Sequence, residues 1–361
     1  MKIEKYSPLM NEVQICQLAA DLVWKRFENL SITRNIKTVN SGVADFCFDI
    51  EFNTGMTCRI FGLVKNNGEP RIIRNAINTL KDYASDYINM RMYNIFVAPY
   101  ISSDSVEIFR ENKVGYMDFC GNCLLQHDMF YIEVSGNPNK YVEKRDNKNY
   151  LARSSVAISS ILREMLYQHQ KYWQVKELSD ITKTSIGMVS NVKTYLLNKE
   201  WAITYDGKFR ISNVESLMKA WSSDYNKGKD VSYEFYSLDT IPEIEYNLHS
   251  LYAKKGIKCT LTSFSAAVRY SPTVRYNKVS VYVEQQDFDE VINELNLKKV
   301  DTGGNVTIII PYNECVLMHA WQTKDAFVVS PVQAVLDLMQ NKSRGEEAAQ
   351  AIIFKEYRDN G

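Results

Sequence analysis

The chain has 361 residues, a length that usually folds as two or three domains and not around one hydrophobic core. With 45% hydrophobic and 24% charged residues, its composition is that of a globular protein and excludes a disordered or collagen-like chain. The 43 Lys and Arg residues balance 43 Asp and Glu residues, so any contact with nucleic acid must depend on a local basic patch.

Two further features predict a cytoplasmic protein without a membrane partner. No apolar run reaches the roughly 18 to 20 residues that span a bilayer, and the first residues, MKIEKYSPLMNEVQ, do not have the pattern of a secretory signal. The seven cysteines are an odd number without framework spacing. This usage favours reduced, mostly buried thiols.

The first predicted unit, residues 1–145, has an α/β pattern. Residues 9–29 have apolar residues at helical spacing, and the runs ADFCFDIEF and CRIFGLVK after them predict a β-hairpin. A helix at 71–90, a strand at NIFVAPY, a helix at 103–112 and strands at VGYMDF, CLLQ and FYIEVSG complete this unit. The polar run GNPNKYVEKRDNKN, residues 136–149, predicts a linker.

The order helix, three antiparallel strands, helix, strand is typical of the restriction-endonuclease core. That chemistry needs an Asp on one strand and Glu-x-Lys on the next, because two carboxylates hold the metal and the lysine steers the attacking water. Asp45 or Asp49 would supply the first carboxylate and Lys65 the lysine, but Leu63 stands where the second carboxylate is needed. We therefore expect a degenerate copy of this fold, with no catalytic residues, metal site or cofactor. An unrelated α/β unit and an active metal-dependent nuclease are the alternatives.

Cys120-Gly121-Asn122-Cys123 has the CxxC spacing of a metal or redox site. A structural zinc ion needs four ligands, however, and neither a second cysteine pair nor a second nearby histidine accompanies His127. The favoured interpretation is a turn at Gly121-Asn122 between two small side chains.

Residues 150–222 have the element order of a winged helix-turn-helix. SSVAISSILREMLYQHQ and KELSDI predict two helices, TKTS a turn, SIGMVSNVKTYLLNKE a long third helix, and WAITYDGKFRIS a hairpin that turns on Asp206-Gly207. The third helix is expected to bury an apolar stripe of Ile186, Val189, Val192, Leu196 and Leu197. The stripe would pack against Ile158, Ile161, Leu162, Leu166, Leu178 and Ile181.

The opposite face of the third helix carries short or amide-bearing side chains, which permit close approach to base edges and phosphates. Its N-terminus offers backbone N–H donors, with Thr184 or Ser185 as the N-cap. Residues 151–221 hold 10 Lys and Arg against 6 Asp and Glu, and two of these cations lie on the hairpin. The predicted DNA-contacting residues are Thr184, Ser185, Met188, Ser190, Asn191, Lys193, Thr194, Lys208 and Arg210. A winged helix that binds only protein partners is the alternative.

The third predicted unit, residues 230–361, follows a polar break, SSDYNKGKD, at 222–230. Helices are predicted at 242–255, 286–295 and 331–356, the last broken at KSRGEE, and strands at KCTLT, KVSVYVE and NVTIIIP. LTSFSAA and VSVYVE are compatible with a nucleotidyltransferase-like unit, but Gly-Ser followed by Asp-x-Asp, the metal-binding arrangement of that fold, is missing. His249 and His319 are isolated, so no catalytic site is expected here.

Four stretches in this order, FVAPYIS (96–102), VGYMDFCGN (114–122), WQVKELSDITKTSIGMVSNVKTYL and VSPVQAVLDLMQNKSRGEEAAQAI (329–352), resemble the AbiEi antitoxins of type IV toxin-antitoxin systems. Larger members of that family are similar along nearly the whole chain. The resemblance implies a bacterial repressor that binds double-stranded DNA at its own promoter. It also implies a C-terminal region that counteracts a nucleotidyltransferase-like toxin.

Together these features predict an α/β multidomain protein that acts as a transcriptional regulator and not as an enzyme. Its parts are a restriction-endonuclease-like unit at 1–145, a winged helix-turn-helix at 150–222 and a nucleotidyltransferase-like, antitoxin-like α/β unit at 230–361. The alternatives are a nuclease that uses Asp45 or Asp49 with Lys65, and an interaction scaffold without DNA affinity.

Overall fold

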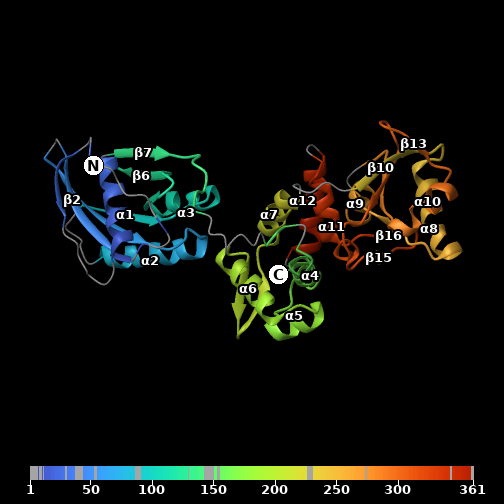
Figure 1. The fold of residues 1–361 in the computed structure, drawn as a ribbon, viewed down its shortest axis with the longest axis horizontal. Helices are drawn as coiled ribbons and strands as arrows, with labels where there is room; N and C mark the ends of the chain where they lie inside the picture. Colours follow the sequence, from blue (N-terminus) through green and yellow to red (C-terminus); the bar gives the residue numbers. More distant parts are fainter. Residues whose placement is uncertain are drawn as a thin grey trace. The chain divides into compact units, whose positions relative to one another are not determined.

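The computed structural model of the chain describes residues 7, 10, 12–28, 31–36, 44–52, 55–85, 91–128, 130–141, 150–152, 155–225, 231–272, 275–341 and 344–358. It is a mixed α/β protein with two compact units, Met1–Lys148 and Asn149–Gly361 (Figure 1). The predicted linker lies partly outside the described residues, as do residues 226–230 of the polar break. None of the described helices is both long and apolar enough to cross a bilayer.

The first unit contains a seven-stranded sheet whose strands follow one another in chain order. They are β1 (Ser31–Ile36), β2 (Phe46–Phe52), β3 (Thr57–Val64), β4 (Met92–Ala98), β5 (Gly115–Asp118), β6 (Cys123–His127) and β7 (Phe130–Val134). The first three strands are antiparallel, β3, β4 and β5 are parallel, and β5, β6 and β7 are antiparallel. The two parallel connections run through α2 (Pro70–Ser85) and α3 (Ser103–Asn112), since parallel neighbours need a crossover.

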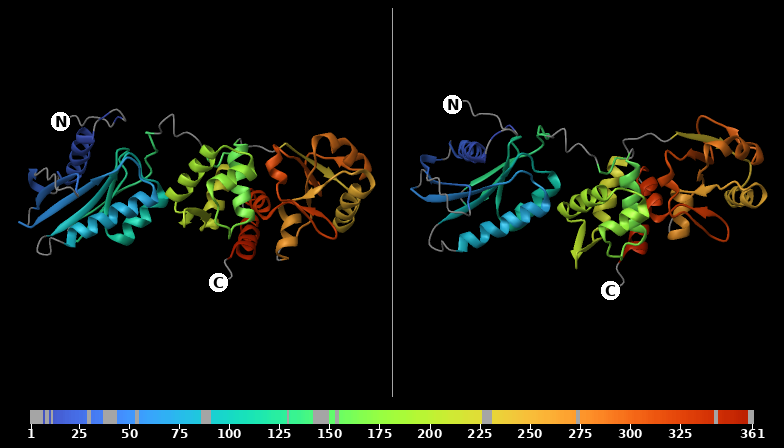
Figure 2. Two further views of the ribbon diagram at one scale, coloured as in Figure 1. Left: turned by 90° about the horizontal axis from the view of Figure 1, so that it is seen from below. Right: turned by 60° about the horizontal axis from the view of Figure 1, so that its bottom comes forward.

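Helices cover both faces of this sheet, α1 (Glu12–Phe27) on one side and α2 on the other (Figure 2). Side chains alternate along β2, so that Phe48 packs in the core with Val23 of α1, whereas Cys47 packs in the core with Ile77 of α2. The element order is therefore the one that the sequence predicts, although the sequence did not locate β1. The restriction-endonuclease-like assignment stays a prediction.

The second unit begins with helices α4 (Val156–Tyr167), α5 (Val175–Thr182) and α6 (Ile186–Asn198), followed by strands β8 (Ala202–Tyr205) and β9 (Lys208–Ile211) and helix α7 (Val214–Tyr225). Strands β8 and β9 form an antiparallel hairpin. Trp173 exchanges two backbone hydrogen bonds with Phe209, of 2.8 and 3.0 Å, which ties the segment between α4 and α5 to the hairpin. Both side chains are fully buried.

One position of the expected apolar stripe, Ile186, is wrong, and so is one of its expected packing partners, Ile181. Val189, Val192 and Leu196 are fully buried, but Ile186 is 56% exposed and Ile181 is 47% exposed. Ile186 is the first residue of α6 and Ile181 lies in the last turn of α5, so both lie beside the exposed turn between the helices. Leu197 is half-buried and packs against the core.

The rest of the second unit surrounds another seven-stranded sheet, in the order β13-β10-β14-β12-β11-β16-β15. The strands are β10 (Val231–Tyr236), β11 (Thr260–Leu261), β12 (Val279–Tyr282), β13 (Lys298–Lys299), β14 (Val306–Ile310), β15 (Trp321–Gln322) and β16 (Phe327–Val328). The helices are α8 (Ile241–Lys255), α9 (Ser263–Tyr270), α10 (Phe288–Glu294), α11 (Pro331–Leu338) and α12 (Gly345–Tyr357), with 3₁₀ turns at Gln285–Asp287 and Glu314–Leu317. Pairs β12/β14 and β11/β16 are parallel.

One hydrophobic core runs through the whole second unit. It includes Leu162 of α4, Val192 of α6, Trp221 of α7, Ile308 of β14 and Leu336 of α11. Helices α4 and α7 contact α11, and α7 also contacts α12. The helical part and the sheet therefore share their packing, and a division into separate domains at 150–222 and 230–361 stays a prediction.

Candidate nucleic-acid interface

The turn between α5 and α6 is held by short local hydrogen bonds. Lys183 takes the left-handed conformation after α5, with φ 52°. The Ser179 hydroxyl donates to the Thr184 carbonyl at 2.6 Å, and the hydroxyls of Thr182 and Thr184 lie 2.8 Å apart. Ser185 is the N-cap of α6, because its hydroxyl accepts a 3.1 Å hydrogen bond from the Met188 N–H. These bonds fix the angle at which α6 leaves the turn.

Helix α6 presents a polar face to solvent. The exposed side chains Ser190, Asn191 and Thr194 lie on it, away from the buried stripe, and exposed Ser185 caps the start of the helix. The Thr194 hydroxyl donates to the Ser190 carbonyl at 3.0 Å, whereas the Asn191 amide makes no hydrogen bond to any residue that the structure describes. Three of the predicted contact residues are thus brought together on one accessible face, with a fourth, Ser185, at the exposed start of the helix.

Two other predicted contact residues are less accessible. Thr184 is half-buried and its hydroxyl lies beside that of Thr182. Met188 is also half-buried and packs against the hydrophobic core. Both residues therefore hold α6 in place.

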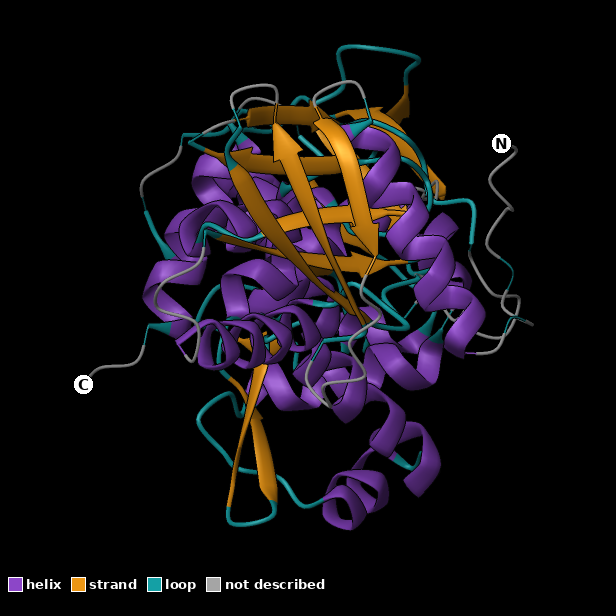
Figure 3. Ribbon diagram, turned by 90° about the vertical axis from the view of Figure 1, so that its left-hand side faces the viewer, coloured by secondary structure: helices purple, strands orange, loops and turns teal. Residues whose placement is uncertain are grey.

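The hairpin β8–β9 stands out from the helices (Figure 3). Its turn has φ 48° at Asp206 and φ 73° at Gly207, the two positive values that a type I′ turn requires. Lys208 and Arg210 on β9 are half-buried. The Arg210 guanidinium lies 5.3 Å from the ring centre of Tyr172.

Lys193 of α6 connects the two elements. Its amino group lies 5.4 Å from the centre of the Phe209 ring on β9, within cation–π distance. Lys193 therefore contacts the hairpin at the residue that separates Lys208 from Arg210 in the sequence.

Sequence reasoning did not single out two exposed cations here, Lys176 of α5 and Lys183 of the turn. The excess of Lys and Arg in residues 151–221 was the signal that could have found them. A third lysine is less available, because Lys171 is ion-paired with Glu177 at 2.8 Å and lies over the Trp173 ring. The hydrogen bond from Lys171 lowers the pKa of Glu177.

The residues of the nuclease alternative have structural partners in the first unit. An Asp45 carboxylate oxygen accepts a 2.7 Å hydrogen bond from the Val64 N–H. Asp49 pairs with Arg59 through contacts of 2.6 and 2.8 Å, and Leu63 is buried in the core. Among the residues that the structure describes, no group of three His, Cys, Asp or Glu side chains could hold a metal ion.

The CxxC stretch forms a turn, as the sequence predicts. Gly121 has φ 97°, and the buried Asp118 carboxylate accepts hydrogen bonds from the Asn122 N–H at 2.9 Å and from the Asn122 amide at 2.8 Å. Burial raises the pKa of both Cys120 and Cys123, which keeps these thiols protonated at neutral pH.

One comparison with known proteins gives a match. Residues 210–358 match the model of a family described as transcriptional regulator, AbiEi antitoxin, type IV toxin-antitoxin system. The matched segment starts within β9 and covers the sheet of the second unit, so α4, α5 and α6 lie outside it. Of the curated proteins and the solved structures, none matches this chain.

Proposed function

We propose that residues 150–222 are a DNA-reading module, because residues 210–358 of this chain match the AbiEi family of antitoxin transcriptional regulators from type IV toxin-antitoxin systems. This module is a winged helix-turn-helix, with α5 and α6 as the helix-turn-helix and β8–β9 as the wing. It binds double-stranded DNA at the protein's own promoter and represses transcription there.

The observation that carries this proposal is the exposed polar face of α6. Ser185, Ser190, Asn191 and Thr194 are short side chains, so the helix backbone can approach the floor of a major groove. At Gly187 on the same helix, an added Cβ atom would meet nothing within 4 Å, so this side of α6 is open. The amide of Asn191 has the donor and acceptor that pair with adenine.

Charge around α6 supports contact with the phosphate backbone. Lys193 lies on α6 over the Phe209 ring of the hairpin, and the hairpin itself carries Lys208 and Arg210 on β9. Thr184 and Met188 complete the site by fixing the start of α6. Cations that contact phosphate fix the register of a recognition helix on the duplex without reading its sequence.

The proposed role of the sheet follows from the family, and that of residues 1–145 from the element order of the first unit. The sheet at 230–361 is a nucleotidyltransferase-like fold without its metal-binding carboxylates and contacts a nucleotidyltransferase-like toxin. Residues 1–145 are a degenerate restriction-endonuclease-like unit without catalytic activity, an assignment supported by the structural partners of Asp45 and Asp49. The protein acts in the bacterial cytoplasm.

The test is a gel-shift assay of the full chain at fixed salt, with the DNA upstream of its own gene. Asn191→Ala combined with Lys193→Ala is expected to weaken binding about tenfold or more, because a base contact is worth about 1–3 kcal/mol. Both side chains lie outside the buried core, so the melting temperature should hardly change. The charge control is Lys219→Ala, an exposed lysine on α7.

Unchanged DNA binding by the double variant would show that α6 is not the recognition helix. No binding by the wild-type chain, even at low salt, would favour the interaction scaffold over a DNA-binding regulator. Cleavage of the DNA with added Mg²⁺, lost in Lys65→Ala, would instead favour the nuclease.

A further inference from the structure

A cavity of about 590 Å³ lies within the second unit. Its walls come from the end of α4, the end of α9, the segment before β15, the start of α11 and the end of α12. We infer that this cavity binds a small organic anion that carries a planar ring, either a nucleoside monophosphate or an aromatic carboxylate. Its volume lies within the range of about 300–1,000 Å³ that is typical of small-molecule sites.

The most buried cation in the wall is Arg163 of α4, which is 1% exposed. Its guanidinium donates to the Ser159 hydroxyl at 3.1 Å and to the Gln333 side-chain oxygen at 2.6 Å. Both partners are neutral, and the Nη1 atom has no hydrogen-bond partner in the part of the chain that the structure describes. The Asp337 carboxylate, which also accepts a hydrogen bond from Gln333, offsets part of the Arg163 charge. The Nη1 donor itself stays unused, and an unused buried donor is costly, so a ligand anion would complete the set.

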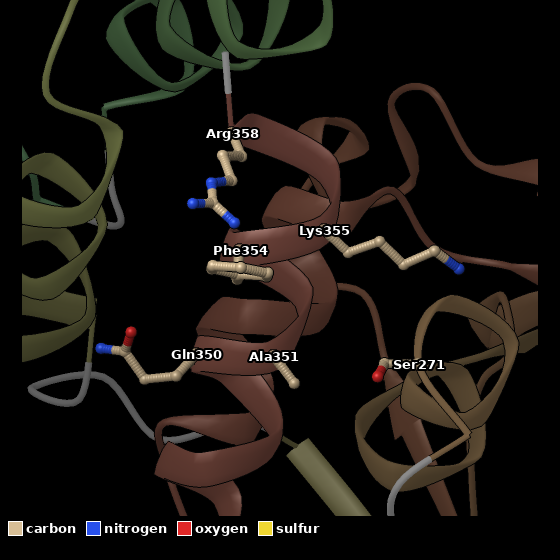
Figure 4. A pocket seen from close by; sticks show the side chains of 6 residues that line it. All are labelled: Ser271, Gln350, Ala351, Phe354, Lys355 and Arg358. Atoms are coloured by element: carbon tan, nitrogen blue, oxygen red, sulfur yellow. The ribbon is translucent and has the colours of Figure 1, made fainter. Parts of the chain in front are cut away.

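Lys355 of α12 adds a second cation at the cavity. Figure 4 is a view of a neighbouring hollow that Lys355 also lines, and it shows this side chain directed from α12 toward the side on which Ser271 lies. There its amino group donates to the Tyr270 carbonyl at 2.5 Å, again a neutral partner. Arg163 and Lys355 therefore both favour a negatively charged occupant.

The other charged side chains in the wall change this balance little. Arg269 is already compensated by Glu245 at 2.7 Å and by Asp325 at 3.1 Å. Glu356 is the one acidic residue among the described residues that line the cavity. The lining thus keeps an excess of positive charge.

Flat rings form part of the same wall. Tyr167 and His319 are stacked, with ring centres 3.8 Å apart and planes inclined by 4°. Trp321 donates from its indole N–H to the Tyr270 hydroxyl at 2.7 Å, which fixes its ring, while the side chain remains 42% exposed. Such faces can stack on a planar ring, which explains why an aromatic anion fits better than an inorganic one.

Isothermal titration calorimetry on the full chain tests the inference with three probes, namely adenosine monophosphate, salicylate and inorganic phosphate. Saturable binding at one site per chain is expected for at least one ring-bearing probe, and at least tenfold weaker binding for phosphate. Which of the two ring-bearing probes binds more tightly tells whether the site prefers a phosphate or a carboxylate.

Two variants locate the binding. Lys355→Met and Trp321→Ala change side chains at the exposed edge of the cavity, and each should weaken binding about tenfold without preventing folding. The matched control is Arg358→Met. Arg358 is also an exposed cation on the C-terminal side, and with Lys355 it lines a neighbouring hollow, but it does not line this cavity, so the control separates the two places. The affinity of the Arg358→Met variant for the ring-bearing probes should equal that of the wild type.

Three results would overturn the inference. They are no heat with either ring-bearing probe, wild-type affinity in both cavity variants, and a loss in Arg358→Met as large as that in Lys355→Met. Phosphate binding as tight as that of adenosine monophosphate would overturn the requirement for a ring.

Discussion

Arg163 of α4 donates a 2.6 Å hydrogen bond to Gln333 of α11, a residue 170 positions further along the chain. Both side chains are buried. The Gln333 amide nitrogen in turn lies 2.9 Å from the Tyr225 hydroxyl and 2.7 Å from an Asp337 oxygen. This buried polar network joins the first helix of the proposed DNA-reading module to the helices of the AbiEi-like part.

The Arg163–Gln333 contact should be measurable as a coupling energy. Arg163→Met and Gln333→Leu are each expected to lower the free energy of unfolding. The double variant is expected to lose less of this free energy than the two single variants lose together. The difference should be about 1.5–3 kcal/mol, because the bond is buried and its donor is charged. Urea unfolding of the wild type, the two single variants and the double variant measures this coupling energy.

A surface ion pair is the control for this cycle. Lys255 and Glu290 are also 2.7 Å apart but exposed to solvent, so their coupling should be much smaller. Equal coupling in the two cycles would show that burial adds nothing to the Arg163–Gln333 bond.

Asp337 should give the protein a specific pH dependence. Its burial raises the pKa of the carboxyl group from 3.8 to about 6, although hydrogen bonds from Thr262, Tyr282 and Gln333 oppose the shift. The folded state therefore binds this proton more tightly than the unfolded chain does. The resulting stabilisation is complete below about pH 4 and is lost as the pH rises to about 6, a change of about 3 kcal/mol.

Urea unfolding of wild type and Asp337→Asn between pH 4 and pH 8 measures this effect. The variant cannot lose a proton at this position. Its free energy of unfolding minus that of the wild type should therefore rise between pH 4 and pH 6 and stay constant above pH 6. Parallel stability profiles would contradict the assignment.

The hairpin cations should determine part of the salt dependence of DNA binding. If Lys208 and Arg210 each neutralise one phosphate, their joint replacement by Ala should reduce the slope of log K against log salt concentration by about 2. Filter binding at several salt concentrations measures the slope. Lys219→Ala should leave it unchanged, and an unchanged slope in the hairpin variant would exclude the wing from the interface.

The turn of the hairpin depends on Gly207. Its φ of 73° is strained for a residue with a side chain, so Gly207→Ala should destabilise the protein by about 1 kcal/mol. Gly187→Ala is the control with the opposite expected sign, because Gly187 lies inside α6 and a Cβ atom there has open space. Chemical denaturation of both variants measures these changes in stability. A lower free energy of unfolding in both variants would contradict this account.

Local signals in the sequence were sufficient for the elements around the proposed interface. Ser185 as an N-cap, the helical period of Val189, Val192 and Leu196, and Asp206-Gly207 as a turn are all determined by neighbours in the chain. The error at Ile186 has a physical origin. Periodicity tells which side of a helix is apolar, but it does not tell where the packing partner ends.

Long-range features could not be predicted in this way. Strand β10 is defined by its pairing with β14, where Val231 lies opposite Ile310, and strands such as β15 and β16 have only two residues. Arg163, Gln333 and Asp337 have side chains of the types that are usually exposed. Their burial results from partners on other elements, which no local pattern contains.

The long sequence separation between Arg163 and Gln333 also sets an order of events during synthesis. When a ribosome has completed residues 150–222, the helices that pack against α4 and α7 have not yet been translated. The hydrophobic core that supports the proposed DNA-reading module is complete only after α11 and α12 have emerged from the ribosome. A nascent or prematurely terminated chain therefore lacks a completely folded DNA-reading module. If the proposed function is correct, only full-length chains would bind the promoter.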